Sequence, residues 1–105
     1  MYMSARIEAL TQMLAQDPAN TFARYGLAMA HLGDDQAEAA LREFTTLLEH
    51  SPDYAAAYFH GGRALETLGR VDDARALYER GIAVTTRTGD GHTRSELQGA
   101  LDLLG

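Results

Sequence analysis

Apolar side chains recur along this chain every three to four residues, which is the spacing that places them on one side of an α-helix. The spacing predicts helices over residues 4–16, 22–32, 35–50, 54–68 and 71–87, and a last helix that ends near Leu104. No stretch alternates apolar and polar residues for long enough to predict a β-strand. The pattern therefore predicts an all-α protein of about six helices joined by short turns.

The predicted helices end at short clusters of turn-forming residues. Pro18 and Pro52 end two of them, because proline disfavours the helical conformation in the residue before it. Glycine-containing clusters at 33–35, 69–70 and 88–91 end the others. We also expect two helices to begin with a capping box, in which side chains at the helix start satisfy free backbone N–H groups. The expected boxes are Asp35 with Glu38, and Thr93 with Glu96.

The residues around these breaks repeat at a fixed interval, the one that separates Pro18 from Pro52. Three further pairs at the same interval match in size or aromatic character: Ala28/Gly62, Ala40/Ala74 and Phe44/Tyr78. A fixed period of this length is typical of helical repeats, whose unit is a helix pair too small to bury its own apolar face. Stacked units should therefore share one continuous core.

Three glycines, Gly61, Gly62 and Gly81, lie inside predicted helices. A glycine inside a helix costs about 1 kcal/mol relative to alanine. Close approach between two helices would explain this cost, because a large side chain packs on the flat surface that glycine leaves. We expect Tyr58 and Tyr78 to be the side chains that fill this space.

These residues resemble the tetratricopeptide repeat family, whose unit is a helix–turn–helix with the same period. The second unit carries the resemblance through Tyr58-x2-Gly61-Gly62-x2-Leu65, then Leu68-Gly69, then Ala74, Tyr78 and Gly81. It departs from the family at Gly61, where leucine is usual, and at Thr86, where the closing proline is missing. Its second helix should therefore run on toward Thr88. The resemblance implies a short right-handed α-solenoid of antiparallel helix pairs.

The first unit matches the family less closely. Without gaps, Arg24 stands at the family's first aromatic position, and Leu32-Gly33 falls two positions before the Leu-Gly position. A shifted alignment through Phe22, Tyr25 and Met29 restores that position but needs two length changes, so we prefer the register without gaps. The single domain 1–105 then divides into a half repeat (4–18), a first repeat (19–52), a second repeat (53–88) and a C-terminal capping helix (90–104).

Composition and charge exclude several classes of function. The 105 residues carry a formal net charge of -6, which argues against binding to nucleic acid or an anionic membrane surface. No apolar run approaches the ~18 residues that a membrane span needs, and the N-terminus lacks the apolar stretch of a secretory signal. The absence of cysteine excludes disulfides and thiolate chemistry. We expect a cytoplasmic protein.

No group of residues indicates catalysis, a metal or a cofactor. The four histidines do not pair at the three- or four-residue spacing of metal ligands; they are His31, His50, His60 and His92. The acidic pairs 34–35 and 72–73 stand at helix starts, where negative charge stabilises the helix dipole. Gly89–His92 lacks the lysine of a phosphate-binding loop. We therefore expect a protein that is not an enzyme and holds neither a metal nor a cofactor.

The resemblance to tetratricopeptide proteins also implies a binding groove. In that family the first helices of successive units line a concave groove, which holds extended or helical peptide segments. Carried over without gaps, the groove positions are Phe22, Tyr25, Met29, Ala56, Phe59 and Arg63. The alternative is that flanking helices cover these side chains as ordinary core. The family's clamp for C-terminal carboxylates needs lysine and asparagine at groove positions. Neither residue stands at a groove position of this chain.

Two functions remain open at this point. The first is a non-catalytic interaction module for an apolar peptide or helix of a protein partner, with Arg63 able to hold a carboxylate in a bidentate contact. It predicts that Tyr25→Ala or Arg63→Glu weakens partner binding without unfolding the domain. The second is a self-assembling structural unit, a homodimer through its terminal helices, because a short array exposes uncapped end faces.

Overall fold

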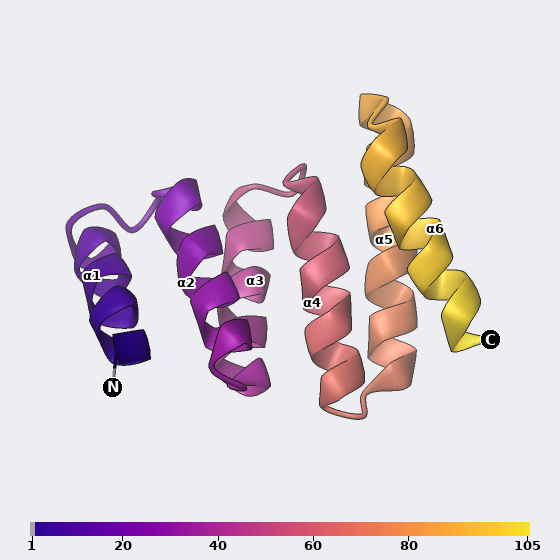
Figure 1. Cartoon of the computed structure of the whole chain (residues 1–105). Helices are drawn as coiled ribbons and strands as arrows, with labels where there is room; N and C mark the ends of the chain where they lie inside the picture. Colours follow the sequence, from indigo (N-terminus) through magenta and orange to yellow (C-terminus); the bar gives the residue numbers. More distant parts are fainter. Residues whose placement is uncertain (1) are drawn as a thin grey trace.

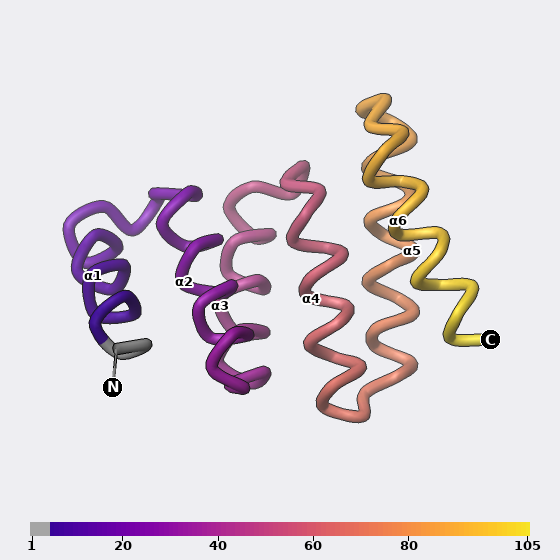
Figure 2. The backbone as a smooth tube through the Cα atoms, in the orientation of Figure 1, coloured from indigo at the N-terminus to yellow at the C-terminus, as the bar shows by residue number. Residues whose placement is uncertain are grey.

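A computed structural model describes residues 2–105, with side chains described from Ala5 onward. The described residues form six α-helices and no strand, which confirms the all-α prediction. The helices are α1 (Tyr2–Gln16), α2 (Thr21–Gly33), α3 (Ala37–His50), α4 (Ala55–Thr67), α5 (Val71–Thr88) and α6 (Gly91–Leu104). Each packs against the next in the chain, so that they form an α-solenoid with α1 and α6 at opposite ends (Figures 1 and 2).

The backbone itself repeats at the interval found in the sequence. The start of α4 follows that of α2, and the start of α5 follows that of α3, at the same interval that separates the two prolines. The turns repeat as well: Gln36 N–H donates to the carbonyl of His31 at 2.8 Å, and Arg70 N–H donates to the carbonyl of Leu65 at 2.9 Å. This is the register without gaps, in which Leu32-Gly33 belongs to the end of α2 rather than to the turn.

The turn before α3 differs from its sequence-based prediction. Asp35 stands where the next unit has Gly69, and both adopt the left-handed backbone, with φ of 56° and 77°. Aspartate tolerates this conformation better than most residues. The expected capping box of Asp35 with Glu38 is therefore wrong, because Asp35 closes the α2 turn. The N-cap of α3 is Gln36, which makes no side-chain capping hydrogen bond.

The turn before α6 is shorter than predicted. α5 runs to Thr88, as the missing proline indicates, and Gly89 closes it in the left-handed conformation with φ of 81°. Asp90 then caps α6 at once, because its carboxylate accepts the Thr93 N–H at 3.1 Å. The expected capping box of Thr93 with Glu96 is wrong, since Thr93 already lies within the first turn of the helix.

The contact between α4 and α5 depends on two tyrosines and two glycines. Tyr58 and Tyr78 are fully buried. A Cβ atom added at Gly62 would lie 2.1 Å from Cε1 of Tyr78, and one added at Gly81 would lie 2.6 Å from Cβ of Tyr58. Both distances are far below carbon–carbon contact at about 3.5–4.0 Å. Each tyrosine therefore packs directly on the glycine of the opposite helix, which confirms the prediction for these two glycines. The prediction is wrong for Gly61, where an added Cβ atom would meet Leu77 at 3.0 Å and Phe44 at 3.5 Å instead.

The buried tyrosine of α4 also explains an unusual residue of the first unit. The Tyr58 hydroxyl donates to the carbonyl of Pro52 at 2.6 Å. Arg24 stands at the equivalent position, and its Nη2 donates to the carbonyl of Pro18 at 3.0 Å, while its Nη1 pairs with Glu43 at 2.7 Å. The arginine thus makes the same hydrogen bond to the turn as the aromatic residue that it replaces.

The ends of the solenoid are closed differently. α1 packs on α2 through a small apolar cluster of its own, built around Leu14 and Leu27. α6 joins the main core through Leu97, which is fully buried. A Cβ atom added at Gly81 would lie 2.9 Å from Cδ1 of Leu97, so the glycine that receives Tyr58 also receives a side chain of α6. The position of α6 therefore depends on the same close contact as that of α5.

Two alanine substitutions test this packing. We expect Gly62→Ala to lower the free energy of unfolding by about 2–3 kcal/mol, because the new methyl group would overlap the ring of Tyr78. The matched control is Gly99→Ala in α6, where nothing lies within 4 Å of the added atom. It should stabilise the helix by about 0.5–1 kcal/mol. Urea denaturation measures both, and a neutral Gly62→Ala variant would contradict the packing.

Candidate functional site

The six residues predicted to line a groove lie on α2 and α4. The side of the solenoid that carries α2, α4 and α6 is called the groove face below, and it faces the viewer in Figure 1. Phe22 is 77% exposed and Arg63 is exposed, whereas the other four, Tyr25, Met29, Ala56 and Phe59, are partly buried. Of these, Tyr25, Met29 and Phe59 each pack one side against the core and leave the other side at the surface.

Phe59 and Arg63 line an open pocket of about 470 Å³ between α4 and α6, which we call the leucine pocket. The residues that α6 contributes to it are Glu96, Gly99, Ala100 and Leu103. The Arg63 guanidinium lies over the Phe59 ring at 5.9 Å from its centroid. Leu103 is 90% exposed. Aromatic and arginine side chains such as Phe59 and Arg63 are enriched at protein interfaces.

Tyr25 and Ala56 line a second open pocket of about 380 Å³, which we call the tyrosine pocket. Its other residues come from the starts of α4 and α6: Asp53, Tyr54, Ala55, Asp90 and Thr93. The rings of Tyr25 and Tyr54 lie 5.2 Å apart. Hydrogen bonding to Thr93 lowers the pKa of Asp90, so this carboxylate stays ionised. Asp53 forms an ion pair with Arg87.

His60 lies between the two pockets. Its ring centroid is 6.1 Å from that of Tyr25, in the tyrosine pocket, and 5.2 Å from that of Phe59, in the leucine pocket. Burial lowers the pKa of His60; the nearby Glu96 raises it and Arg63 lowers it further. The imidazole is therefore neutral at pH 7, and it packs against an aromatic ring of each pocket without lining either pocket itself. Phe22 and Met29 line neither pocket.

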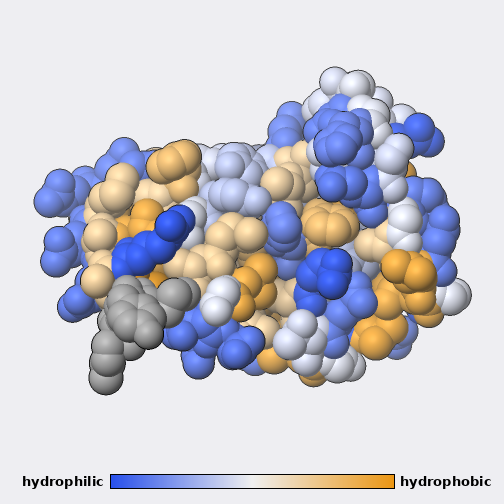
Figure 3. All heavy atoms as spheres, viewed as in Figure 1, coloured by the Kyte–Doolittle hydropathy of each residue, from blue (hydrophilic) through white to orange (hydrophobic). Residues whose placement is uncertain are grey.

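Sequence reasoning missed the contribution of α6. The spacing predicts the last helix only as a cap of the solenoid, yet Glu96 and Leu103 face the same pocket as Phe59 and Arg63. In Figure 3, hydrophobic surface over α4 and α6 lies beside a hydrophilic cluster on this face. The sequence held one clue, because Leu101, Leu103 and Leu104 cannot all share one side of a helix.

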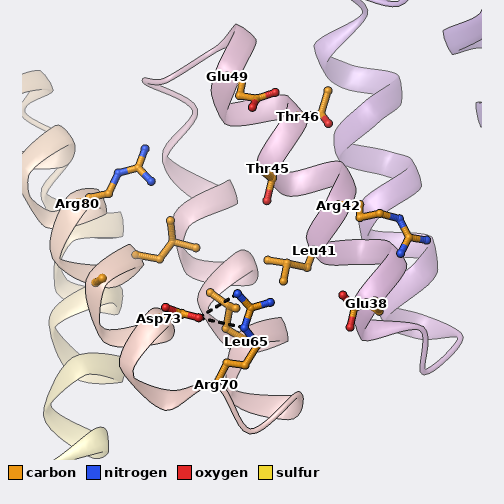
Figure 4. Close-up of a pocket in the computed structure, with 12 residues that line it drawn as sticks. Glu38, Leu41, Arg42, Thr45, Thr46, Glu49, Leu65, Arg70, Asp73 and Arg80 are labelled. Atoms are coloured by element: carbon orange, nitrogen blue, oxygen red, sulfur yellow. Dashed lines mark hydrogen bonds and ion pairs between the residues drawn. The ribbon is translucent and has the colours of Figure 1, made fainter.

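A further groove lies between α3 and α5, over α4, with a volume of about 620 Å³ (Figure 4). Leu41, Leu65 and Leu77 are its apolar residues. Its charged residues have both signs and come from α3, from α5 and from Arg70, the N-cap of α5, which pairs with Asp73 at 2.9 Å. The sequence did not predict this groove, because it depends on how far α5 stands from α3.

The described residues hold no constellation that suggests a metal centre. No three of their histidine, aspartate and glutamate side chains lie close enough together to hold a metal ion. The helices of residues 2–105 also include none that is long and apolar enough to cross a membrane.

The stacked helix pairs and the groove face define a helical-repeat protein. A family model described as "Tetratricopeptide repeat" matches residues 25–86. A TPR repeat-containing protein of Pseudomonas aeruginosa is 32% identical over 91 residues, which make up 87% of each chain. The chain belongs to the tetratricopeptide repeat family. Domains of this family are typically non-catalytic modules for protein–protein interaction.

Solved structures share the fold. A tetratricopeptide repeat domain protein from Salinibacter ruber is 42% identical, with a TM-score of 0.77 over 81% of this chain and 94% of that one. A protein from Bordetella parapertussis is 33% identical, with a TM-score of 0.82 over 93% of this chain and 85% of that one. Each of the two structural matches covers most of the six-helix solenoid.

Two groove-face variants should differ in stability. Tyr25→Ala removes a ring that packs against Phe44 and Tyr54, so we expect a loss of about 1–2 kcal/mol in the free energy of unfolding. Arg63→Glu changes an exposed side chain and should stay within about 0.5 kcal/mol of the unchanged protein. Urea denaturation checks both. An Arg63→Glu variant as unstable as Tyr25→Ala would mean that Arg63 is part of the core.

Proposed function

We propose that this protein is a non-catalytic module that binds a peptide or helix of a partner protein on its groove face, without a cofactor. The observation that carries the proposal is the exposure of large apolar side chains on this face. Leu103 is 90% exposed on α6, and Phe22 is 77% exposed on α2. Phe22 lies on the same stripe of α2 as Tyr25 and Met29, because residues three, four and seven apart share a helix face.

The energetics favour a bound partner at these positions. Removing a leucine or phenylalanine side chain from water stabilises a complex by about 1.5–3 kcal/mol when burial is complete. The leucine pocket adds an aromatic ring and a guanidinium, which are enriched where partners bind most strongly. Phe59 and Arg63 are therefore the residues of the sequence-based prediction that we expect to contribute most, together with Leu103.

A peptide selection tests the proposal. A random peptide library displayed on phage is selected on the immobilised full chain, and the selected peptides are resynthesised and measured by fluorescence anisotropy. We expect Leu103→Glu to weaken their binding by about tenfold or more, because it places a charge in the apolar contact. The matched control is Val71→Glu, since Val71 is 40% exposed and lies in neither pocket of the groove face.

The control should bind the selected peptides as the unchanged protein does. Equal losses in Leu103→Glu and Val71→Glu would contradict binding on the groove face. Selected peptides that bind normally to Leu103→Glu would contradict it as well. Circular dichroism establishes that both variants remain helical.

Self-assembly through the terminal helices is the second candidate function. Met13 on α1 is 42% exposed, and Leu103 on α6 is 90% exposed, so each terminal helix presents a large apolar side chain to the solvent. A homodimer would show twice the chain mass in size-exclusion chromatography with light scattering, and Leu103→Glu or Met13→Glu would return it to the monomer. A monomer whose mass does not change with concentration would contradict self-assembly.

A further inference from the structure

We infer that the segment bound on the groove face carries a basic side chain at one end and, about three residues away, an apolar side chain followed by a carboxylate. The basic side chain occupies the tyrosine pocket, and the apolar side chain with its carboxylate occupies the leucine pocket. This inference rests on the proposed function, because it names the chemistry of the partner that the same face binds.

The two pockets are separate sites along one direction. They share no residue: the leucine pocket lies between α4 and α6, and the tyrosine pocket lies at the starts of these two helices beside Tyr25 of α2. Ala56 in the tyrosine pocket and Arg63 in the leucine pocket are seven residues apart on α4, which corresponds to roughly 10 Å along a helix. An extended chain advances about 3.3 Å per residue. Side chains about three residues apart can therefore enter the two pockets at once.

The tyrosine pocket has the chemistry that suits a lysine or arginine side chain. The rings of Tyr25 and Tyr54 offer faces on which a cation is attracted. Asp53 and Asp90 add two carboxylates. Asp53 pairs with Arg87, and Asp90 accepts the backbone N–H of Thr93 at the start of α6. A carboxylate can accept about four hydrogen bonds, so both keep room for another donor. Two negative charges against one positive charge leave the pocket negative.

The leucine pocket suits an apolar side chain next to a negative charge. Phe59 and Leu103 supply the apolar contact. Arg63 is exposed, rests over the Phe59 ring, and takes part in no ion pair with another described residue. It can therefore bind a carboxylate in a bidentate contact. Glu96, on the α6 side of the same pocket, would repel that carboxylate, which leaves the Arg63 side for it.

Charge order then fixes the direction of the bound segment. The opposite order would place a carboxylate beside Asp53 and Asp90 and a basic side chain beside Arg63. Like charges brought together at an interface weaken the binding of a segment with the wrong charge order. Such repulsion contributes more to specificity than to the affinity for the correct segment. The net charge of -6 on the whole chain also attracts basic segments over longer distances.

Three capped peptides test the charge order in NMR titrations of the isotope-labelled full chain. The first contains Lys-Ser-Ser-Leu-Asp, the second has its two charges exchanged as Asp-Ser-Ser-Leu-Lys, and the third is the neutral Gln-Ser-Ser-Leu-Asn. Each exposed charge pair changes affinity by up to about fivefold, so we expect the first peptide to bind about tenfold more tightly than the second. Its addition should shift the backbone amides of Tyr54, Thr93, Gly99 and Leu103.

Equal affinities of the first two peptides on the groove face would overturn the inference and leave the proposed function intact. Amide shifts away from both pockets, or no binding of any peptide, would overturn it too. The groove face itself is tested independently by the phage selection, whose random peptides carry no assumed charge order.

A charge-exchange variant sharpens the test. Arg63→Glu should bind the first peptide about fivefold more weakly and should prefer a fourth peptide, Lys-Ser-Ser-Leu-Lys, in which the carboxylate is replaced by an amine. The matched control is Arg42→Glu, which changes an arginine on α3 outside both pockets. It should change both affinities less than twofold. The same reversal of preference in Arg42→Glu would show that only net charge is sensed and would overturn the inference.

Discussion

The structure depends on the reciprocal contact in which Tyr58 packs on Gly81 and Tyr78 packs on Gly62. Two helical glycines cost about 2 kcal/mol relative to alanine, and the burial of two whole tyrosine rings offsets this cost. The contact sets the distance between α4 and α5. Leu97 of α6 packs on the same Gly81. The tyrosine–glycine contact therefore also determines where α6 lies, and with it the width of both pockets on the groove face.

The first unit has other residues at the positions of this contact, with Ala28 and Leu47 in place of the two glycines. Tyr78 donates its hydroxyl to Glu66, and burial together with this hydrogen bond raises the pKa of Tyr78, so the hydroxyl remains a donor. In the first unit Phe44 and Leu32 stand at these two positions. The hydroxyl and its acceptor are thus replaced together, which leaves no unpaired polar group and costs little.

The sequence was sufficient to predict the helices, the register without gaps and the tyrosine–glycine contacts, because these follow from spacing and residue size. It was not sufficient for the caps of α3 and α6, because φ of Asp35 and the early start at Gly91 depend on how the preceding helix ends. The sequence could not predict the two pockets of the groove face for a similar reason. Leu103 becomes part of the groove face only through the packing of α6 on α5 and α4. Peptide binding at Phe59 and Arg63 stays a prediction.

The most direct measurement of the central contact is a nuclear Overhauser experiment on the full chain in solution. The packing predicts strong cross-peaks between the Hα protons of Gly62 and the ring protons of Tyr78. It also predicts cross-peaks between the Hα protons of Gly81 and the Hβ protons of Tyr58. Their absence, with both tyrosines assigned, would contradict the reciprocal contact and with it the placement of α6 on the groove face.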